Sequence, residues 1–184
     1  FILYNVGDLK TSGIDIDVRA LLGEYWMLNG GFSYTDAMIE SFVGADCYAG
    51  QTEEQGCISG KQDLSGKELS NSPDFKTSFA LEYNRLIDDW ELEVFGSIAY
   101  QWQSSTHFSL LNNPATAVGS YGVANFNFGV KDWDEVYKVT FFANNITNQY
   151  YPSGISDFSN FIASGGGKAI AHFIPRAADR YYGI

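Results

Sequence analysis

The sequence lacks several features that would place it in common protein classes. None of its apolar runs approaches the roughly 18 residues that a membrane-spanning helix needs, which excludes a helical membrane protein. Basic residues are scarce, since 11 Lys and Arg stand against 22 Asp and Glu and give a net charge of −11. Such a chain has little with which to neutralise a row of phosphates, so nucleic acid is not an expected partner.

Residues that perform chemistry are equally sparse. The chain has two histidines and two cysteines, with no serine in a nucleophile elbow, no His-Glu pair at zinc spacing and no cysteine beside a histidine. Glu91 and Glu93 lie two apart in one expected strand, so they cannot face each other across a sugar as a glycosidase pair would. We therefore expect no enzyme, no cofactor and no metal site.

Aromatic residues and glycines are abundant instead. The chain holds 12 Tyr, 14 Phe, 4 Trp and 19 Gly, and short polar clusters interrupt it too often for long helices. Residues 137–144 show the recurring pattern, because Tyr137, Val139, Phe141 and Ala143 alternate with mostly polar neighbours. A two-residue period is that of a strand with one apolar face, and the cluster after it favours a turn. The sequence predicts an all-β fold.

Connections between the expected strands alternate between short and long. The strands cover about residues 2–22, 26–38, 77–83, 90–102, 124–131 and 137–144, with a further strand starting near 180. Long segments run over 40–73, 104–120 and 147–175, so one end of the antiparallel sheet has tight turns and the other has long loops. This asymmetry is typical of transmembrane β-barrels of the bacterial outer membrane. Trp26, Trp90 and Trp133 at the turn end, and Tyr34, Tyr100, Trp102 and Tyr121 at the loop end, match two aromatic girdles.

Four pieces of the sequence, in order, resemble the closing strands of TonB-dependent outer-membrane receptors. They are Asn5-Val6-Gly7 with residues 12–17 (SGIDID), residues 28–37 (LNGGFSYTDA), residues 143–151 (ANNITNQYY), and Pro175-Arg176 with residues 180–183 (RYYG). Asp15 stands where the family more often has glutamate. The plug domain, the TonB-contacting box and the terminal aromatic residue of the last strand do not occur in residues 1–184.

The resemblance implies that the chain is one segment of a large plugged barrel. Barrels of this type have about 22 strands, with short periplasmic turns and long extracellular loops, so roughly seven strands leave an open edge on each side. Unpaired strand edges are costly in hydrocarbon, and the chain opens at Phe1 without an initiator Met or a leader. We expect residues 1–184 to be the C-terminal part of the barrel domain, without the plug.

For function, the resemblance implies active import across the outer membrane of a Gram-negative bacterium. The implied partners are TonB, reached through the missing N-terminal part, outer-membrane lipid and lipopolysaccharide, and a small ligand. A ferric siderophore or another iron complex is the favoured ligand, while haem, cobalamin and glycans share the same barrel. Two alternatives stay open: a passive outer-membrane porin, and a secreted β-sandwich adhesin or lectin, which would bury its apolar face against a second sheet.

Candidate site residues lie in the long loops. Cys47 and Cys57 stand ten residues apart in the first loop, and in an exported protein we expect them to form a disulfide, with two free thiols as the alternative. Candidate ligand contacts are His107, Phe108, Asn112, Asn113, Phe158 and Phe161. For His107 and His172 individually, a solvated loop residue is the favoured interpretation and an iron-complex contact the alternative.

Overall fold

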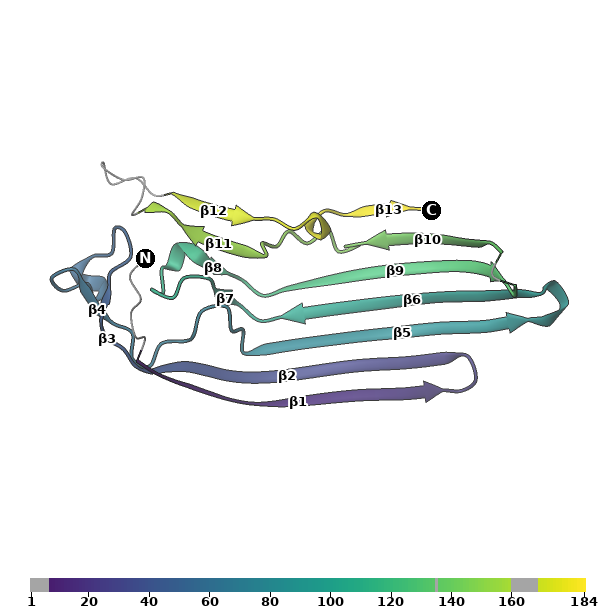
Figure 1. Ribbon diagram of the computed structural model, residues 1–184, viewed down its shortest axis with the longest axis horizontal. Coiled ribbons are helices and arrows are strands. Elements are labelled where there is room, and N and C mark those ends of the chain that lie inside the picture. Colours follow the sequence, from purple (N-terminus) through teal and green to yellow (C-terminus); the bar gives the residue numbers. More distant parts are fainter. Residues whose placement is uncertain (1–6, 135, 160–168) are drawn as a thin grey trace.

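The computed structural model describes residues 7–134, 136–159 and 169–184, and its main element is one antiparallel sheet of seven strands in the order β1-β2-β5-β6-β9-β10-β13 (Figure 1). The strands of this sheet are β1 (Asp8–Leu22), β2 (Trp26–Ser41), β5 (Phe75–Ile87), β6 (Leu92–Gln103), β9 (Tyr121–Asp132), β10 (Lys138–Asn144) and β13 (Tyr181–Gly183). The strands follow one another across the sheet in the order in which they occur in the chain, with β1 and β13 at its edges, so the sheet is a meander.

Short and long connections fall at opposite ends of the sheet, as the sequence predicts. The turns β1–β2, β5–β6 and β9–β10 lie at one end, and the second of them contains the short 3-10 helix η2 (Asp88–Trp90) (Figure 1). The three long connections lie at the other end. They contain the remaining short elements: β3 (Val43–Asp46), η1 (Glu53–Gln55), β4 (Lys61–Asp63), β7 (Thr106–His107), η3 (Pro114–Thr116), β8 (Ala117–Val118), β11 (Gly154–Asp157), β12 (Ile170–Phe173) and η4 (Arg176–Ala178).

The pairing register places most apolar side chains of β1, β2, β5, β6, β9 and β10 on the same face. Ile16 pairs with Phe32, Leu81 pairs with Ile98, and Ile98 pairs with Phe126. Because side chains alternate between the two faces along every strand, these cross-strand pairs determine the face on which each remaining side chain of the strands lies. The apolar face is formed chiefly by Ile14, Ile16, Val18, Trp26, Leu28, Phe32, Phe79, Leu81, Tyr83, Val94, Ile98, Tyr100, Phe126, Phe128, Val130, Val139 and Phe141.

Most of this apolar face is uncovered in the described chain. Ile14, Phe126 and Phe128 are each more than 40% exposed, whereas the few fully buried apolar side chains lie at the long-loop end. A continuous exposed apolar surface of this extent needs a partner, such as hydrocarbon. No helix among the described residues is long and apolar enough to cross a membrane.

The opposite face is polar and is linked across strands by side-chain hydrogen bonds. Asn29 Nδ2 donates to Glu82 Oε1 at 2.9 Å, and Asn84 Nδ2 donates to Glu93 Oε1 at 2.7 Å. Lys131 Nζ lies 3.1 Å from Glu93 Oε2. These contacts satisfy polar groups within the sheet, so this face suits water or a polar protein surface.

Phe95 is one of the apolar residues on the polar face, and its cross-strand partner explains how it fits. Phe95 pairs with Gly129, and a Cβ added to Gly129 would lie 2.5 Å from Phe95 Cζ. The ring therefore occupies the space that glycine leaves open, and Lys138 Nζ lies 4.5 Å from the ring centroid.

Two expectations, one about a strand and one about the aromatic girdle, differ from the structure. Trp90 lies in the turn helix η2 and not in the strand that follows it, because the chain reverses over Asp88–Trp90 and Glu91 takes a left-handed φ of 51°. Tyr121 pairs with Gln103 and therefore lies on the polar face, so it does not belong to the girdle at the loop end. The first strand begins at Asp8 in the described chain, and residues 1–6 of the expected strand lie outside the described residues.

Candidate functional site

The long connections at one end of the sheet form a packed assembly rather than three separate loops. A small apolar core is made by Ile39, near the end of β2, with Ala45 and Leu64 of the first connection, all of them less than 3% exposed. Leu110 and Leu111, from the second connection, pack against this core. Because apolar contacts of this kind fix the loops relative to each other, any ligand would meet a preformed surface here.

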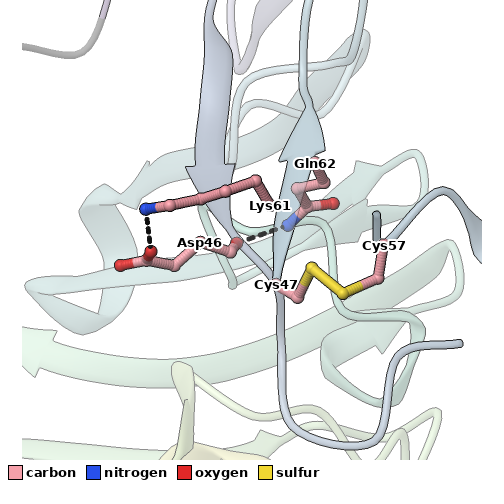
Figure 2. Close-up of polar contacts among 5 residues, drawn as sticks. All are labelled: Asp46, Cys47, Cys57, Lys61 and Gln62. Carbon is pink, nitrogen blue, oxygen red and sulfur yellow. Dashed lines mark hydrogen bonds and ion pairs between the residues drawn. A yellow bond between two sulfur atoms is a disulfide. The ribbon is translucent and has the colours of Figure 1, made fainter. Parts of the chain in front are cut away.

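The tip of the first connection is held by a disulfide and by polar contacts around Gln62 (Figure 2). Cys47 and Cys57 are joined, with 5.8 Å between their Cα atoms. Lys61 Nζ pairs with Asp46 Oδ1 at 2.5 Å. Gln62 is buried, and its Nε2 donates to the carbonyl oxygens of Asp46 at 2.8 Å and Leu111 at 3.2 Å. The tip is thus cross-linked internally and is tied to the second connection.

His107 is buried at the junction of the first and second connections. Its carbonyl oxygen accepts a hydrogen bond from the Asn71 amide at 2.7 Å, and its side chain is only 9% exposed. Burial lowers the pKa of the imidazole, while the nearby Glu68 carboxylate opposes that shift. The interpretation of His107 as a solvated loop residue is therefore wrong, because packing of two loops removes it from water. His172 is exposed and lies in β12.

Asn113 joins the second connection to the third. Its Oδ1 accepts from the Ala115 amide at 3.0 Å and caps η3, and its Nδ2 donates to Asp157 Oδ2 at 2.6 Å. Burial alone would raise the pKa of Asp157, but hydrogen bonds from Ser159 and Asn113 hold that pKa below its usual value. Asn113 is buried and has both ends of its amide engaged, so it positions the loops.

The remaining candidate contacts are more accessible, and they come from two different connections. Phe108 and Asn112 are half-buried, and Asn112 Nδ2 lies 3.5 Å from the Glu68 carbonyl oxygen. Phe158 is 39% exposed in the third connection. Phe161 lies outside the described residues. Phe108, Asn112 and Phe158 are thus the candidates whose side chains reach the surface.

Sequence reasoning did not identify a pair of stacked tyrosines at the base of the loops. The rings of Tyr121 and Tyr151 lie 4.9 Å apart with 12° between their planes. Tyr121 is the first residue of β9 and faces the polar side, while Tyr151 comes from the third connection. Tyr121 and Tyr151 are 30 positions apart, so the sequence did not show that their rings would stack. The one local signal was the adjacent pair Tyr150 and Tyr151, which follows the turn at 144–148.

Asn145 lies in the polar cluster that was expected to form a turn after residues 137–144, and in the structure it is the main polar link between the sheet and the third connection. Its side chain is fully buried, its Nδ2 donates to the carbonyl oxygens of Gln149 and Ala178, each at 2.9 Å, and its Oδ1 accepts from the Gln149 amide at 2.9 Å. Its own amide donates to Asn125 Oδ1 at 2.8 Å. Asn145 therefore ties β10 to β9 and to the segment before β13.

Below the loops, the polar face has a groove with a volume of about 560 Å³. Its lining comes from five neighbouring strands, β1 to β9 in sheet order, and includes Asp15, Asp17, Ser33, Lys76, Ser78, Gln101, Gln103 and Tyr121. A groove that reaches across five strands indicates that the sheet curves toward its polar side. This arrangement fits the inner wall of a barrel. No group of three or more metal-ligating side chains occurs within residues 7–134, 136–159 and 169–184.

Comparison with known proteins identifies the class to which this architecture belongs. The family described as TonB dependent receptor-like, beta-barrel matches residues 1–146. The chain belongs to this family. Its seven-stranded antiparallel sheet, with an apolar and a polar face, is a segment of such a barrel wall.

Among solved structures, the chain is similar to the siderophore receptor PiuA from Acinetobacter baumannii. The two share a TM-score of 0.58 and 18% sequence identity, and the match covers 96% of this chain. It covers only 21% of the PiuA chain, so this chain spans about a fifth of that receptor's length. No curated protein sequence matches the chain. At this identity the likeness supports the fold alone.

Proposed function

We propose that residues 1–184 are part of the barrel of a TonB-dependent transporter that imports a scarce ligand across the bacterial outer membrane. The observation that supports this proposal most directly is the family match over residues 1–146, on a sheet whose apolar face is exposed and whose loops gather at one end. The whole protein would then contain a plug and would draw energy through TonB. We also propose that the protein is not an enzyme.

For the ligand, we propose a ferric siderophore or a similar iron complex. PiuA is a siderophore receptor, and the loop end of this chain offers the aromatic and amide groups that such a ligand would contact. Tyr121 and Tyr151 lie where the loop assembly meets the polar face, and Phe108, Asn112 and Phe158 lie above in the loops. These five residues replace the buried His107 and Asn113 as the candidate contacts.

Uptake by cells that express the full-length receptor tests the transport proposal. Radiolabelled ferric siderophores, haem and cobalamin should be compared in cells with and without TonB, and with a protonophore. We expect one ligand class to bind at the surface in all cells but to accumulate inside only with TonB and a proton gradient. A porin would give uptake that depends only on the external concentration, and full uptake without TonB would refute the proposal.

Substitution of Tyr151 tests where the ligand binds. Tyr151→Ala removes the stack on Tyr121, and we expect it to weaken surface binding by about tenfold, since a well-placed aromatic contact contributes roughly 1 to 1.5 kcal/mol. Tyr150→Ala is the matched control, because Tyr150 is 60% exposed and its ring makes no stacking contact within the described residues. Equal binding by the two variants would remove the tyrosine pair from the site.

A further inference from the structure

The apolar face has a groove close to its short-turn end. The groove has a volume of about 370 Å³ and is lined almost wholly by apolar atoms of Trp26, Leu81, Tyr83, Gly96, Ser97, Ile98, Phe126, Asn127 and Phe128. Trp26 and Tyr83 close one side, with their ring centroids 4.7 Å apart. The groove lies outside the loop assembly and the polar face, so the proposed transport function does not use it.

Gly96 creates the groove. It pairs with Tyr83 on one side and with Phe128 on the other, so a residue without a side chain stands between two ring-bearing residues on one rung. Neighbouring strands lie ~4.8 Å apart, which leaves a slot about as wide as one hydrocarbon chain. A Cβ at Gly96 would lie 3.1 Å from the Asn127 carbonyl oxygen and 3.6 Å from Phe128 Cδ2, and a larger side chain would fill the slot.

A cationic group stands at the turn end of this slot. Arg85 pairs with Val94, two residues along from the pair of Tyr83 and Gly96 and therefore on the same face, which puts the two pairs ~7 Å apart. The Arg85 side chain is exposed, and its Cζ lies 5.1 Å from the centroid of the Tyr25 ring. Within the described ranges no carboxylate forms an ion pair with Arg85, so its charge is available to an external anion.

The turns beyond Arg85 are acidic. Asp88 and Asp89 lie in η2, directly after β5, and Glu24 precedes Tyr25 in the β1–β2 turn. From the slot toward the turns, the surface is therefore apolar, then cationic, then anionic. This order matches an acyl chain, a phosphate and an ammonium group, which is the order in a phospholipid with an ethanolamine headgroup.

We infer that the groove binds one ethanolamine phospholipid from the membrane leaflet on the short-turn side. One acyl chain lies in the slot over Gly96, the phosphate contacts the Arg85 guanidinium, and the ammonium faces the turn carboxylates. Charge-assisted contact with the phosphate and burial of the chain distinguish this lipid from those that merely surround the barrel. The inference depends on the proposed membrane placement.

Native mass spectrometry of the full-length receptor in mild detergent tests this site. The delipidated receptor is titrated with phosphatidylethanolamine or with phosphatidylglycerol that has the same acyl chains. Gly96→Leu fills the slot, and Gly30→Leu is the matched control, because Gly30 lies on the same face and a Cβ there meets only the Ser78 carbonyl oxygen, at 3.8 Å. Heat-modifiable electrophoretic mobility verifies that each variant is folded.

We expect the wild-type receptor and Gly30→Leu to retain one phosphatidylethanolamine in preference to phosphatidylglycerol, and Gly96→Leu to lose at least tenfold in occupancy. Arg85→Gln should weaken binding of both lipids about fivefold, because both carry the phosphate, whereas replacement of Asp88 and Asp89 by Asn should abolish the headgroup preference. Equal occupancy in the two glycine variants, or a preference for phosphatidylglycerol in the wild type, would overturn the inference. Fractionation and TonB-dependent uptake are measured in the same strains. A receptor that imports its ligand in the outer membrane without selective lipid binding refutes the lipid site alone, whereas absence from the outer membrane refutes the proposed function.

Discussion

Replacement of Asn145 should detach the third connection from the barrel wall. Asn145→Ala removes four side-chain hydrogen bonds, those with the Gln149 and Ala178 carbonyl oxygens, the Gln149 amide and the Thr147 hydroxyl. Buried backbone groups that lose their partners cost about 1 to 3 kcal/mol each, and water entering the gap would recover part of that cost. We therefore expect a net loss of about 3 kcal/mol in the local free energy of opening.

Hydrogen exchange of the full-length receptor in detergent measures this opening directly. A change of about 3 kcal/mol corresponds to exchange faster by roughly a hundredfold in peptides that cover 145–159 and 169–179, with peptides from β5 and β6 unchanged. Asn145→Gly, which adopts the left-handed φ of 49° without strain, should still show most of the acceleration, because the larger part of the loss comes from the side chain.

Asn148 provides the control. Its φ of 50° matches the 49° of Asn145, but its side chain is exposed and forms no hydrogen bond with another described residue. Asn148→Ala therefore tests the strain of a left-handed backbone alone, which costs about 1 kcal/mol. If Asn145→Ala and Asn148→Ala accelerated exchange equally, the buried amide would not be the link that the structure indicates.

Three further predictions concern the wall and the first two connections. Ile98→Arg, on the apolar face midway along β6, should make folding into lipid vesicles less favourable by about 2 to 4 kcal/mol. Gln101→Arg, on the polar face, should make it less favourable by less than about 1 kcal/mol. If Gln101→Arg were the more damaging variant, the polar face would be the one that contacts lipid. Peptide mapping without reductant should show Cys47 linked to Cys57, and replacement of both by serine should cost the first loop about 3 kcal/mol without preventing barrel assembly; two alkylatable thiols would contradict this. Because burial lowers the pKa of His107, the unfolded junction binds protons more readily than the folded one, so the stability of the junction should fall as the pH drops below about 6.5. His107→Phe should remove this pH dependence, as read from exchange corrected for intrinsic rates.

Local periodicity was enough to predict the strands and their two faces. The side chains of a strand alternate regardless of its neighbours, so Ile14, Ile16 and Val18 were assigned to one face from the sequence alone. The positions of the turns and loops followed from polar clusters and glycines in the same way. Strand ends were less accurate, because Trp90 was placed in a strand and the structure puts it in a turn.

The loop assembly was decided by tertiary contacts that leave no local signal. His107 is buried because Asn71, 36 residues earlier, binds its backbone and closes one loop against another. Asn113 meets Asp157 across 44 residues, so the sequence could offer it as a ligand contact but could not show that its amide is already engaged.

The register between strands was equally beyond the sequence. It placed Tyr121 on the polar face, next to Tyr151, and set Gly96 between Tyr83 and Phe128, where its missing side chain opens a groove. Alternation determines which side chains share a face within one strand. Only the pairing of strands determines which of them become neighbours, because a shift of two residues keeps the apolar face and changes every cross-strand contact.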